Sequence, residues 1–230
     1  MTGAAALELP QYLLDTYWWA YVHPAGVRLF ERQWLVNLIL CGNYASLRDA
    51  ALQALGPALP GRSLQIGCAY GDLTQTLAAR LAREGRLDVV DIVPLQLANL
   101  ARKLGGDPRV RLRLGDSAAL RAPRASYDRA LIFFLLHEQP EAVRRATLAE
   151  ALRVVKPGGK IVIVDYHRPS RWHPLATALR LLLPRLEPYA LDLWRHPLPH
   201  WLPWACAARV RVETFFGGLY QKCVVTVPAP

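Results

Sequence analysis

The sequence predicts a doubly wound α/β fold built on a mostly parallel sheet. Segments typical of strands alternate with helical segments from residue 62 to residue 166, which is the pattern of a parallel sheet with helices on both faces. Within the strand predicted at residues 129–136, the apolar run 130–136 is unbroken, as expected of a central strand that is covered on both sides. A chain of 230 residues, 53% of them apolar and 20% charged, is long enough for one such domain with a substantial core.

The residues before this alternation are predicted to form a separate helical layer. A helical pattern runs from residue 12 to about residue 55, with breaks at Pro24 and Gly42. We therefore expect an N-terminal helical cap over residues 1–56 and a Rossmann-like domain over residues 57–230.

The domain itself is expected to contain seven strands. Strands are predicted at residues 63–66, 87–93, 110–114, 129–136 and 160–165, and a C-terminal antiparallel hairpin at residues 210–216 and 219–227. The first helix is expected to begin with a capping box of Asp72 and Gln75. The next helix has Pro94 in its first turn, and a third covers residues 141–156, before a turn at 157–159. An insertion at about residues 167–208 is predicted to be a substrate lid.

The turn after the first strand carries the first functional signal. Residues 63–74 resemble the nucleotide-binding turn of an S-adenosylmethionine enzyme, in which an acid precedes Gly-x-Gly-x-Gly. Here Gln65 replaces the acid and Ala69 the middle glycine, while Gly67 and Gly71 remain around Cys68. Glycines let the backbone approach a ligand closely, and the helix that follows offers free N–H groups. All five residues are candidates for cofactor binding.

The next two strand ends extend this signal. Asp91 follows Gly71 by twenty residues, the usual place for an acid that binds ribose hydroxyls. Asp116 and Ser117 follow the third strand, where a carboxylate can accept a hydrogen bond from an adenine amino group. The alternative is ordinary turn chemistry at strand ends. The dinucleotide pattern G-x-G-x-x-G is absent, and residues 152–161 resemble the turn before strand five of class I adenosylmethionine-dependent methyltransferases, so we expect that cofactor.

Strands four and five are followed by a second group of polar residues. His137 and Glu138 come after one strand, and Asp165, Tyr166 and His167 end the other. Neighbouring strand ends would bring these side chains together, where they could act as general acids and bases. Alternatively, His137, Asp165 and His167 could bind a divalent metal. The alternative for each histidine is a structural, hydrogen-bonded role.

Aromatic residues suggest where an apolar ring would bind. Tyr17, Trp18, Trp19 and Tyr21 lie close together, and Trp34 follows. With Tyr166, they are predicted to line a pocket for a flat, apolar substrate; the alternative is core and lid packing. Residues 168–185 form a basic amphipathic segment with one tryptophan, typical of either a membrane interface or an internal packing helix.

Composition limits the classes of binding partner and the cellular compartment that we expect. The net charge of +10 favours anionic partners, but no basic run, zinc knuckle or RNA-recognition motif is present, so nucleic acid is not expected. The four cysteines are scattered, as in a reducing compartment. The sequence shows no secretory signal and no apolar run near the ~20 residues of a membrane span. We expect a cytoplasmic protein, peripheral at the inner face of the cell membrane.

Several long strings make the chain similar to one known family. Residues 15–24, 30–37, 133–143, 164–169, 186–195 and 215–221 resemble the rhodoquinone-biosynthesis family, methyltransferase-like proteins within the class I adenosylmethionine-dependent superfamily, over about residues 12–227. The resemblance implies conversion of ubiquinone to rhodoquinone, in which an amino group replaces a ring methoxy group. It further implies adenosylmethionine as amino donor, a divalent metal such as manganese (Mn²⁺), and a role in anaerobic respiration.

Two other functions remain open from the sequence. One is a conventional methyltransferase acting on a quinone or another apolar small molecule; the other is an inactive domain that binds quinone or cofactor as a sensor. Because the cofactor's α-amino group lies near the position of the missing acid, we expect Gln65 to alter that contact.

Overall fold

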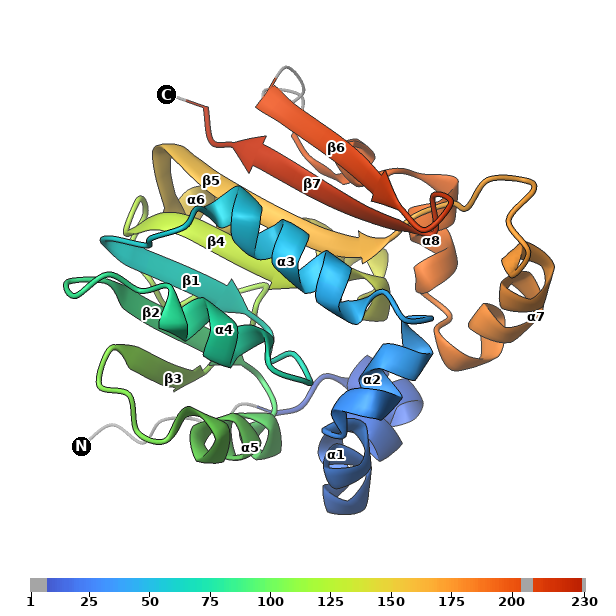
Figure 1. Ribbon diagram of the computed structural model, residues 1–230, viewed down its shortest axis with the longest axis horizontal. Helices are drawn as coiled ribbons and strands as arrows, with labels where there is room; N and C mark the ends of the chain where they lie inside the picture. Colours follow the sequence, from blue (N-terminus) through green and yellow to red (C-terminus); the bar gives the residue numbers. More distant parts are fainter. Residues whose placement is uncertain (1–7, 204–208, 229–230) are drawn as a thin grey trace.

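The computed structural model describes residues 8–203 and 209–228, and these form one seven-stranded sheet with helices around it (Figure 1). The strand order is β3-β2-β1-β4-β5-β7-β6. The strands are β1 (Arg62–Ile66), β2 (Arg86–Asp91), β3 (Val110–Leu114), β4 (Tyr127–Phe133), β5 (Val155–Tyr166), β6 (Val210–Phe215) and β7 (Tyr220–Thr226). The first five pair in parallel, whereas β7 is antiparallel to both β5 and β6. The predicted doubly wound sheet and its C-terminal hairpin are confirmed.

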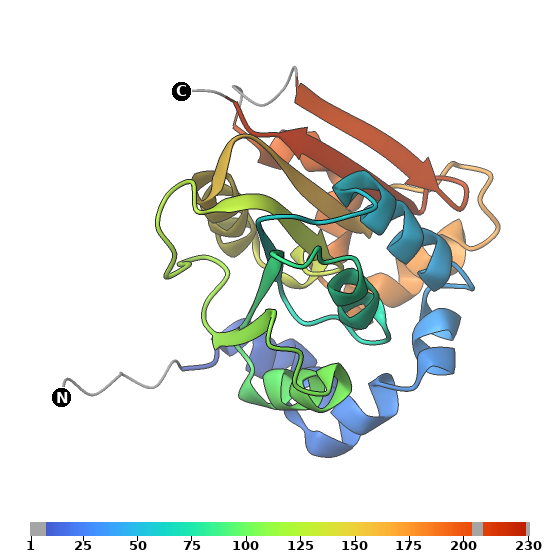
Figure 2. The ribbon, with the colours of Figure 1, turned by 60° about the vertical axis from the view of Figure 1, so that its left-hand side comes forward.

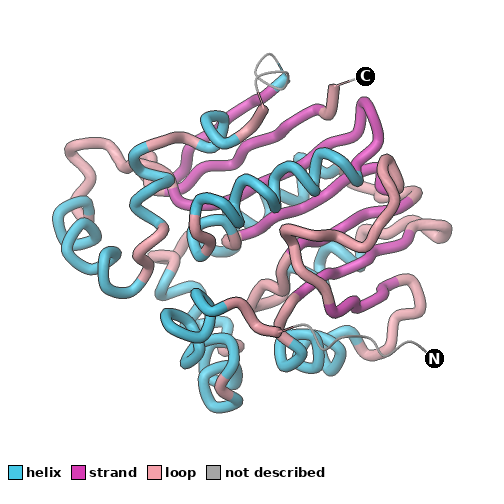
Figure 3. Tube along the Cα trace, turned by 180° about the vertical axis from the view of Figure 1, so that it is seen from behind, coloured by secondary structure: helices cyan, strands magenta, loops and turns pink. Residues whose placement is uncertain are grey.

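Helices cover both faces of this sheet. They are α3 (Tyr44–Leu55), α4 (Leu73–Ala79), α5 (Pro94–Leu104) and α6 (Glu141–Val154). Helix α3 crosses β5 and β7 on the face seen in Figure 1, and α6 packs on β5 from the face seen in Figure 3. The central strand β4 is buried along most of its length, including Ala130, Leu131 and Ile132. This double cover explains why the second half of the strand, residues 130–133, is continuously apolar.

The remaining helices gather beyond the carboxyl ends of the parallel strands. The N-terminal group consists of η1 (Leu13–Val22), α1 (Pro24–Phe30) and α2 (Gln33–Ile39), and Figures 1 and 2 show α1 next to α5, which it contacts. The insertion after β5 contributes α7 (Ala176–Leu186), α8 (Ala190–Arg195) and η3 (Leu198–Trp201). Residues 204–208 of the predicted lid lie outside the described residues.

The N-terminal group is held together by a close helix approach. The ten residues of η1 form a π-helix. This conformation is rare in proteins, and where it occurs it is often found at functional sites. Pro24 begins α1, and His23 Nδ1 accepts a hydrogen bond from the Ala25 N–H. A Cβ at Gly26 would lie 1.7 Å from the Trp19 carbonyl oxygen, so only glycine lets α1 pack against η1.

Three local predictions are wrong in detail. Asp72 occupies the N-cap of α4, but its side chain makes no cap hydrogen bond there and instead pairs with Arg48 at 2.6 Å; Gln75 donates to the Lys103 carbonyl. The strand predicted at 129–136 ends at Phe133, and residues 136–138 form the 3₁₀ turn η2 (Leu136–Glu138). Residues 157–159 belong to β5, whose pairing with β4 shifts register there, rather than to a free turn.

Among the described residues, no helix is both long enough and apolar enough to cross a membrane.

Candidate functional site

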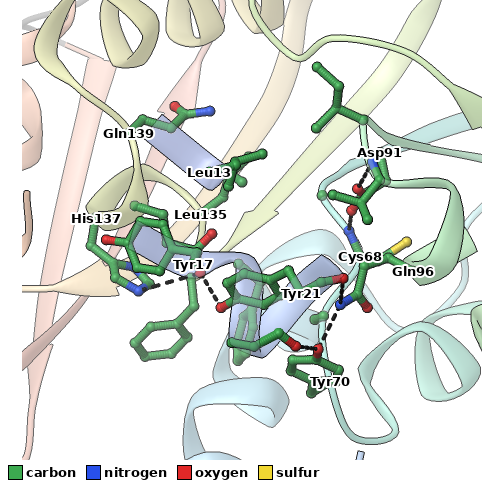
Figure 4. A pocket seen from close by; sticks show the side chains of 18 of the residues that line it. Leu13, Tyr17, Tyr21, Cys68, Tyr70, Asp91, Gln96, Leu135, His137 and Gln139 are labelled. Atoms are coloured by element: carbon green, nitrogen blue, oxygen red, sulfur yellow. Dashed lines mark hydrogen bonds and ion pairs between the residues drawn. The ribbon is translucent and has the colours of Figure 1, made fainter. Parts of the chain in front are cut away.

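A cavity opens where the parallel strands end, roofed by the N-terminal helix η1 and by the end of α7. Its lining comes from the loops after β1, β2, β3 and β4, from β5, and from η1. Figure 4 shows two halves, with Cys68 and Asp91 on one side, His137 on the other, and Tyr21 between them. This is the edge at which an open α/β sheet binds its ligand.

The glycine loop forms the wall of the first half. Gly67 adopts a φ of +84°, which favours glycine, and the next N–H, that of Cys68, donates to Asp91 Oδ2 at 2.6 Å. The second oxygen of Asp91 accepts from the Val93 N–H at 2.8 Å. Burial raises the pKa of Asp91, although these backbone donors oppose the rise. Asp91 therefore ties the ends of two strands together beside the cavity.

The end of β3 adds a second polar group to this half. Asp116 Oδ1 accepts from the Ala118 N–H at 2.8 Å. Ser117 Oγ accepts a hydrogen bond from Gln139 Nε2 at 3.0 Å, while Gln139 Oε1 is buried and has no partner among the described residues. Asp116, Ser117 and Gln139 all line the cavity, so they leave one unsatisfied acceptor near it.

Two residues of the predicted cofactor turn lie behind the cavity wall. Gln65 is fully buried; its Nε2 donates to the Gly67 carbonyl at 2.9 Å and its Oε1 accepts from Thr74 Oγ1 at 3.0 Å. Gly71 packs against Tyr44, whose hydroxyl would lie 2.6 Å from an added Cβ. Neither residue is part of the cavity lining, whereas Gly67, Cys68 and Ala69 are. Gln65 shapes the loop from within.

The second half is centred on a buried histidine. His137 Nδ1 lies 2.9 Å from Asp165 Oδ1, and its Nε2 lies 3.7 Å from Glu138 Oε1. The Tyr21 hydroxyl donates to the same Glu138 oxygen. His137, Glu138 and Tyr166 line the cavity, and the Tyr166 ring meets the imidazole edge-on at 4.9 Å. The predicted neighbourhood of His137, Glu138, Asp165 and Tyr166 is thus present in the fold.

Burial and charge together set the protonation of this group. Burial disfavours the imidazolium, but the charges of Asp165, Glu187 and Glu138, with the hydrogen bond to Asp165, together raise the pKa of His137 to about 9. Burial raises the pKa of Glu138 to about 8, with His137 acting in the opposite direction. Near neutral pH, His137 is therefore a cation paired with Asp165, and Glu138 is a neutral acid.

The backbone that carries His137 is fixed from two sides. Asp165 Oδ2 accepts from the Leu136 N–H at 2.9 Å and from the His137 N–H at 3.3 Å. The fully buried Arg144 donates to the carbonyls of Leu136 and Gln139, each at 2.9 Å. The same guanidinium donates to the carbonyl of Tyr189 at 3.0 Å, so it joins η2 to the insertion.

The structure corrects the predicted metal ligands. His167 does not line the cavity; its Nδ1 lies 2.8 Å from the Gly218 carbonyl in the β6–β7 hairpin. Within residues 8–203 and 209–228, no three His, Cys, Asp or Glu side chains are arranged so that they could hold a metal ion. The set His137, Asp165 and His167 fails because β5 ends at Tyr166 and the chain turns away, so these residues do not fit a metal.

The predicted aromatic residues divide into two groups. Tyr17, Trp19, Tyr21 and Tyr166 line the cavity. Trp18 and Trp34 do not line it, and they are 50% and 59% exposed, so their prediction as substrate contacts is not supported by their position.

Other lining residues were missed by the sequence reasoning. They include Tyr12, Tyr70, Gln96, Gln139 and Glu187. Tyr70 lies inside the glycine turn and Gln139 directly follows His137-Glu138, so their positions gave a signal. Glu187 follows α7 in the insertion, and no pattern in the sequence places it against His137.

Comparisons with known proteins identify the fold of this chain. Residues 64–159 match the family model described as "Methyltransferase domain". A phosphoethanolamine N-methyltransferase 2 of Haemonchus contortus, solved with S-adenosyl-L-methionine, superposes with a TM-score of 0.68 at 14% identity, covering 96% of this chain and 61% of that one. The fold is that of a class I methyltransferase. NodS, an N-methyltransferase of Bradyrhizobium japonicum solved with S-adenosyl-L-homocysteine, superposes with a TM-score of 0.55 at 15% identity, covering 80% of this chain and 87% of that one.

Curated relatives of this methyltransferase-fold chain include enzymes of quinone biosynthesis. A ubiquinone/menaquinone biosynthesis C-methyltransferase, UbiE, of Caulobacter vibrioides is 33% identical over 156 residues, which cover 63% of this chain and 59% of that protein. A demethylmenaquinone methyltransferase of Desulfitobacterium hafniense is 28% identical over 156 residues, covering 66% of this chain and 60% of the relative. The chain thus spans about three fifths of the length of these two relatives.

Proposed function

We propose that this protein is an adenosylmethionine-dependent methyltransferase that acts on a quinone-type or similarly apolar ring. One observation carries the proposal: a single cavity joins a glycine-loop half to an acid–base half centred on His137 and Asp165, with aromatic side chains around it. The similarity to quinone C-methyltransferases supports this choice of substrate.

The first half fits an adenosyl cofactor. The Gly67 backbone is open to the cavity, Asp91 lies at the end of β2 where ribose hydroxyls are bound, and Asp116 lies at the end of β3. The unpaired Gln139 Oε1 needs a hydrogen-bond donor, and an adenine amino group provides one. When bound, adenosylmethionine would supply a methyl group activated by its sulfonium.

The second half prepares the acceptor ring. A protonated His137 would donate from Nε2 to a ring hydroxyl oxygen and favour loss of the hydroxyl proton to water, so that more of the ring is the electron-rich phenolate whose neighbouring carbon attacks the methyl group. The proton displaced from that carbon would pass to the ring oxygen, which restores the aromatic hydroxyl. Asp165 keeps the imidazole charged and oriented, since it holds both Nδ1 and the His137 N–H. The short path from Glu138 to the Tyr21 hydroxyl gives the site a second place to hold a proton.

Mass analysis of quinones tests the proposal. The chain is expressed in a host that makes ubiquinone but no rhodoquinone, and separately in the same host after removal of its quinone C-methyltransferase, so that the unmethylated ring precursor accumulates. We expect the ring of the accumulated precursor to gain one methyl group, and a His137→Ala variant to abolish the gain. An unchanged quinone profile with soluble, folded protein would contradict the proposal.

The second candidate is amination of ubiquinone to rhodoquinone, with a methoxy group replaced by an amino group. It is favoured by the glutamine at position 65, where adenosylmethionine methyltransferases carry an acid, and by the aromatic strings of residues 15–24 and 186–195. Because Gln65 is held within the loop by Gly67 and Thr74, it would act by reshaping the loop and not by touching the cofactor. The same mass analysis separates the candidates, since exchange of methoxy for amino changes ubiquinone itself.

We also propose peripheral contact with anionic lipid at the inner face of the membrane. Trp18, Trp34 and Trp172 are 50%, 59% and 79% exposed, and the Arg171 guanidinium lies over the Trp172 ring at 4.5 Å. Exposed tryptophan beside arginine is typical of a membrane interface. Sedimentation with phosphatidylglycerol vesicles, compared with phosphatidylcholine vesicles, tests this: a Trp18→Ser/Trp34→Ser/Trp172→Ser variant should lose binding.

A further inference from the structure

The roof of the acid–base half contains two polar atoms that no mechanism above uses. Tyr17 is 1% exposed, and its hydroxyl has no hydrogen-bond partner among the described residues. Glu187 Oε2 is likewise buried without a partner. Unpaired polar atoms of this kind cost about 1–3 kcal/mol each, so a folded protein keeps them only where a ligand satisfies them or another role requires them.

The side chains of both residues lie beside the buried histidine. Glu187 Oε2 lies 3.9 Å from His137 Nε2, too far for a direct hydrogen bond but suitable for a shared third atom. The Tyr17 hydroxyl and the Glu187 carboxylate lie close enough to interact, because burial and then Glu187 raise the pKa of the Tyr17 phenol, but they do not reach full hydrogen-bond geometry with each other. Figure 4 shows Tyr17 beside His137, and all three residues line the cavity.

We propose that Tyr17, Glu187 and His137 Nε2 form a polar subsite that binds one ring hydroxyl of the substrate, and therefore selects a phenol or hydroquinone over a ring without a free hydroxyl. The inference rests on the proposed function, because it places the acceptor ring in the second half of the cavity. It assigns a role to two residues that lie outside the matched methyltransferase domain, residues 64–159.

The chemistry of the three atoms matches a hydroxyl group. A hydroxyl accepts hydrogen bonds and donates one. The Tyr17 phenol and the His137 imidazolium donate, whereas the Glu187 carboxylate accepts. An ether oxygen at the same point offers no proton to Glu187, so that carboxylate would stay unpaired and the complex would be weaker.

Binding measurements test the subsite without any turnover. The protein is first saturated with S-adenosylhomocysteine, and trimethylhydroquinone, kept reduced without oxygen, is then titrated by calorimetry, with its dimethyl ether as the second probe. We expect the wild-type protein to bind the hydroquinone at least about tenfold more tightly than the ether, the size of one well-made hydrogen bond to a charged group.

Two variants should remove this preference. Glu187→Gln and Tyr17→Phe are each expected to bring the two probes to within about threefold of each other, with affinity for the ether unchanged. Glu213→Gln is the matched control, because Glu213 lies on β6 and pairs with Lys222. In a transfer assay, both site variants should raise KM for the ring more than they lower kcat.

Other outcomes would overturn the inference. Equal affinity of the wild-type protein for both probes, or a preference that survives in both variants, excludes recognition of a hydroxyl. A variant that loses both probes equally assigns the residue to pocket shape. Tyr17→Phe should also leave thermal stability unchanged or higher, since the hydroxyl has no partner to lose; a marked loss would indicate a structural bond instead. Absence of methyl or amino transfer, with the preference intact, would contradict only the proposed function.

Discussion

Replacing Asp165 with asparagine tests the electrostatics of the acid–base half. The substitution keeps the shape of the side chain and an oxygen for the Leu136 N–H, but it removes the negative charge beside His137. The rise in the pKa of His137 from 6.5 to about 9 corresponds to about 3 kcal/mol in favour of the cation. In the variant, only Glu187 and Glu138 remain to oppose burial, so the pKa of His137 should fall well below its wild-type value.

Titration of the histidine ring by NMR measures this change directly. The fold gives a second readout: a group whose pKa is raised on folding stabilises the protein fully below its unfolded pKa, and the benefit disappears as the pH rises through its folded pKa. The contribution of His137 to the free energy of unfolding should therefore decline between about pH 6.5 and pH 9 in the wild type and be much smaller in Asp165→Asn. A carboxyl outside the cavity, as in Asp107→Asn, is the control. If the ring of the variant still titrates near pH 9, Asp165 is not the source of the shift.

Three further predictions concern residues that hold the site in place. Gln65→Ala removes the donor to the Gly67 carbonyl and should weaken S-adenosylhomocysteine binding several-fold in calorimetry; unchanged affinity would mean that the loop keeps its shape without this bond. Asp91→Ala deprives the Cys68 N–H of its acceptor and should weaken the same binding by more than about tenfold, whereas affinity equal to the wild type would remove Asp91 from the cofactor site. Arg144→Leu leaves three backbone carbonyls without their buried donor and should lower the free energy of unfolding by about 3 kcal/mol in urea denaturation. A loss below about 1 kcal/mol would contradict the role of Arg144 in joining η2 to the insertion.

The parts of the fold that follow from short-range patterns could be predicted. The strand–helix alternation, the unbroken apolar β4 and the glycine pair at 217–218 each depend on local burial or turn geometry, and each is present. Asp72 misled the prediction because a long-range ion pair with Arg48 competes for its carboxylate. Nothing in the sequence near Asp72 indicates that α3 brings Arg48 to it.

In the candidate site, too, features set by local sequence could be predicted, whereas features set by long-range contacts could not. His137 and Asp165 could be predicted as neighbours, because parallel strands that pair side by side end at the same edge. His167 could not be excluded, since the direction in which the chain leaves a strand is set by the hairpin that it meets at Gly218. Tyr17 and Glu187 approach His137 only through the packing of η1 and α7, which depends on contacts between distant parts of the chain.

Tyr21 contacts both halves of the cavity. Its hydroxyl is bonded to Glu138 in the acid–base half, while its ring stacks on Tyr70 of the glycine loop at 5.7 Å and 10°. The Tyr70 hydroxyl in turn donates to the Ala20 carbonyl, one residue before Tyr21 in the chain. The roof helix is thus anchored on the cofactor loop itself. If the two halves hold cofactor and ring as proposed, we expect release of either ligand to disturb Tyr21, which would couple the kinetics of the two events.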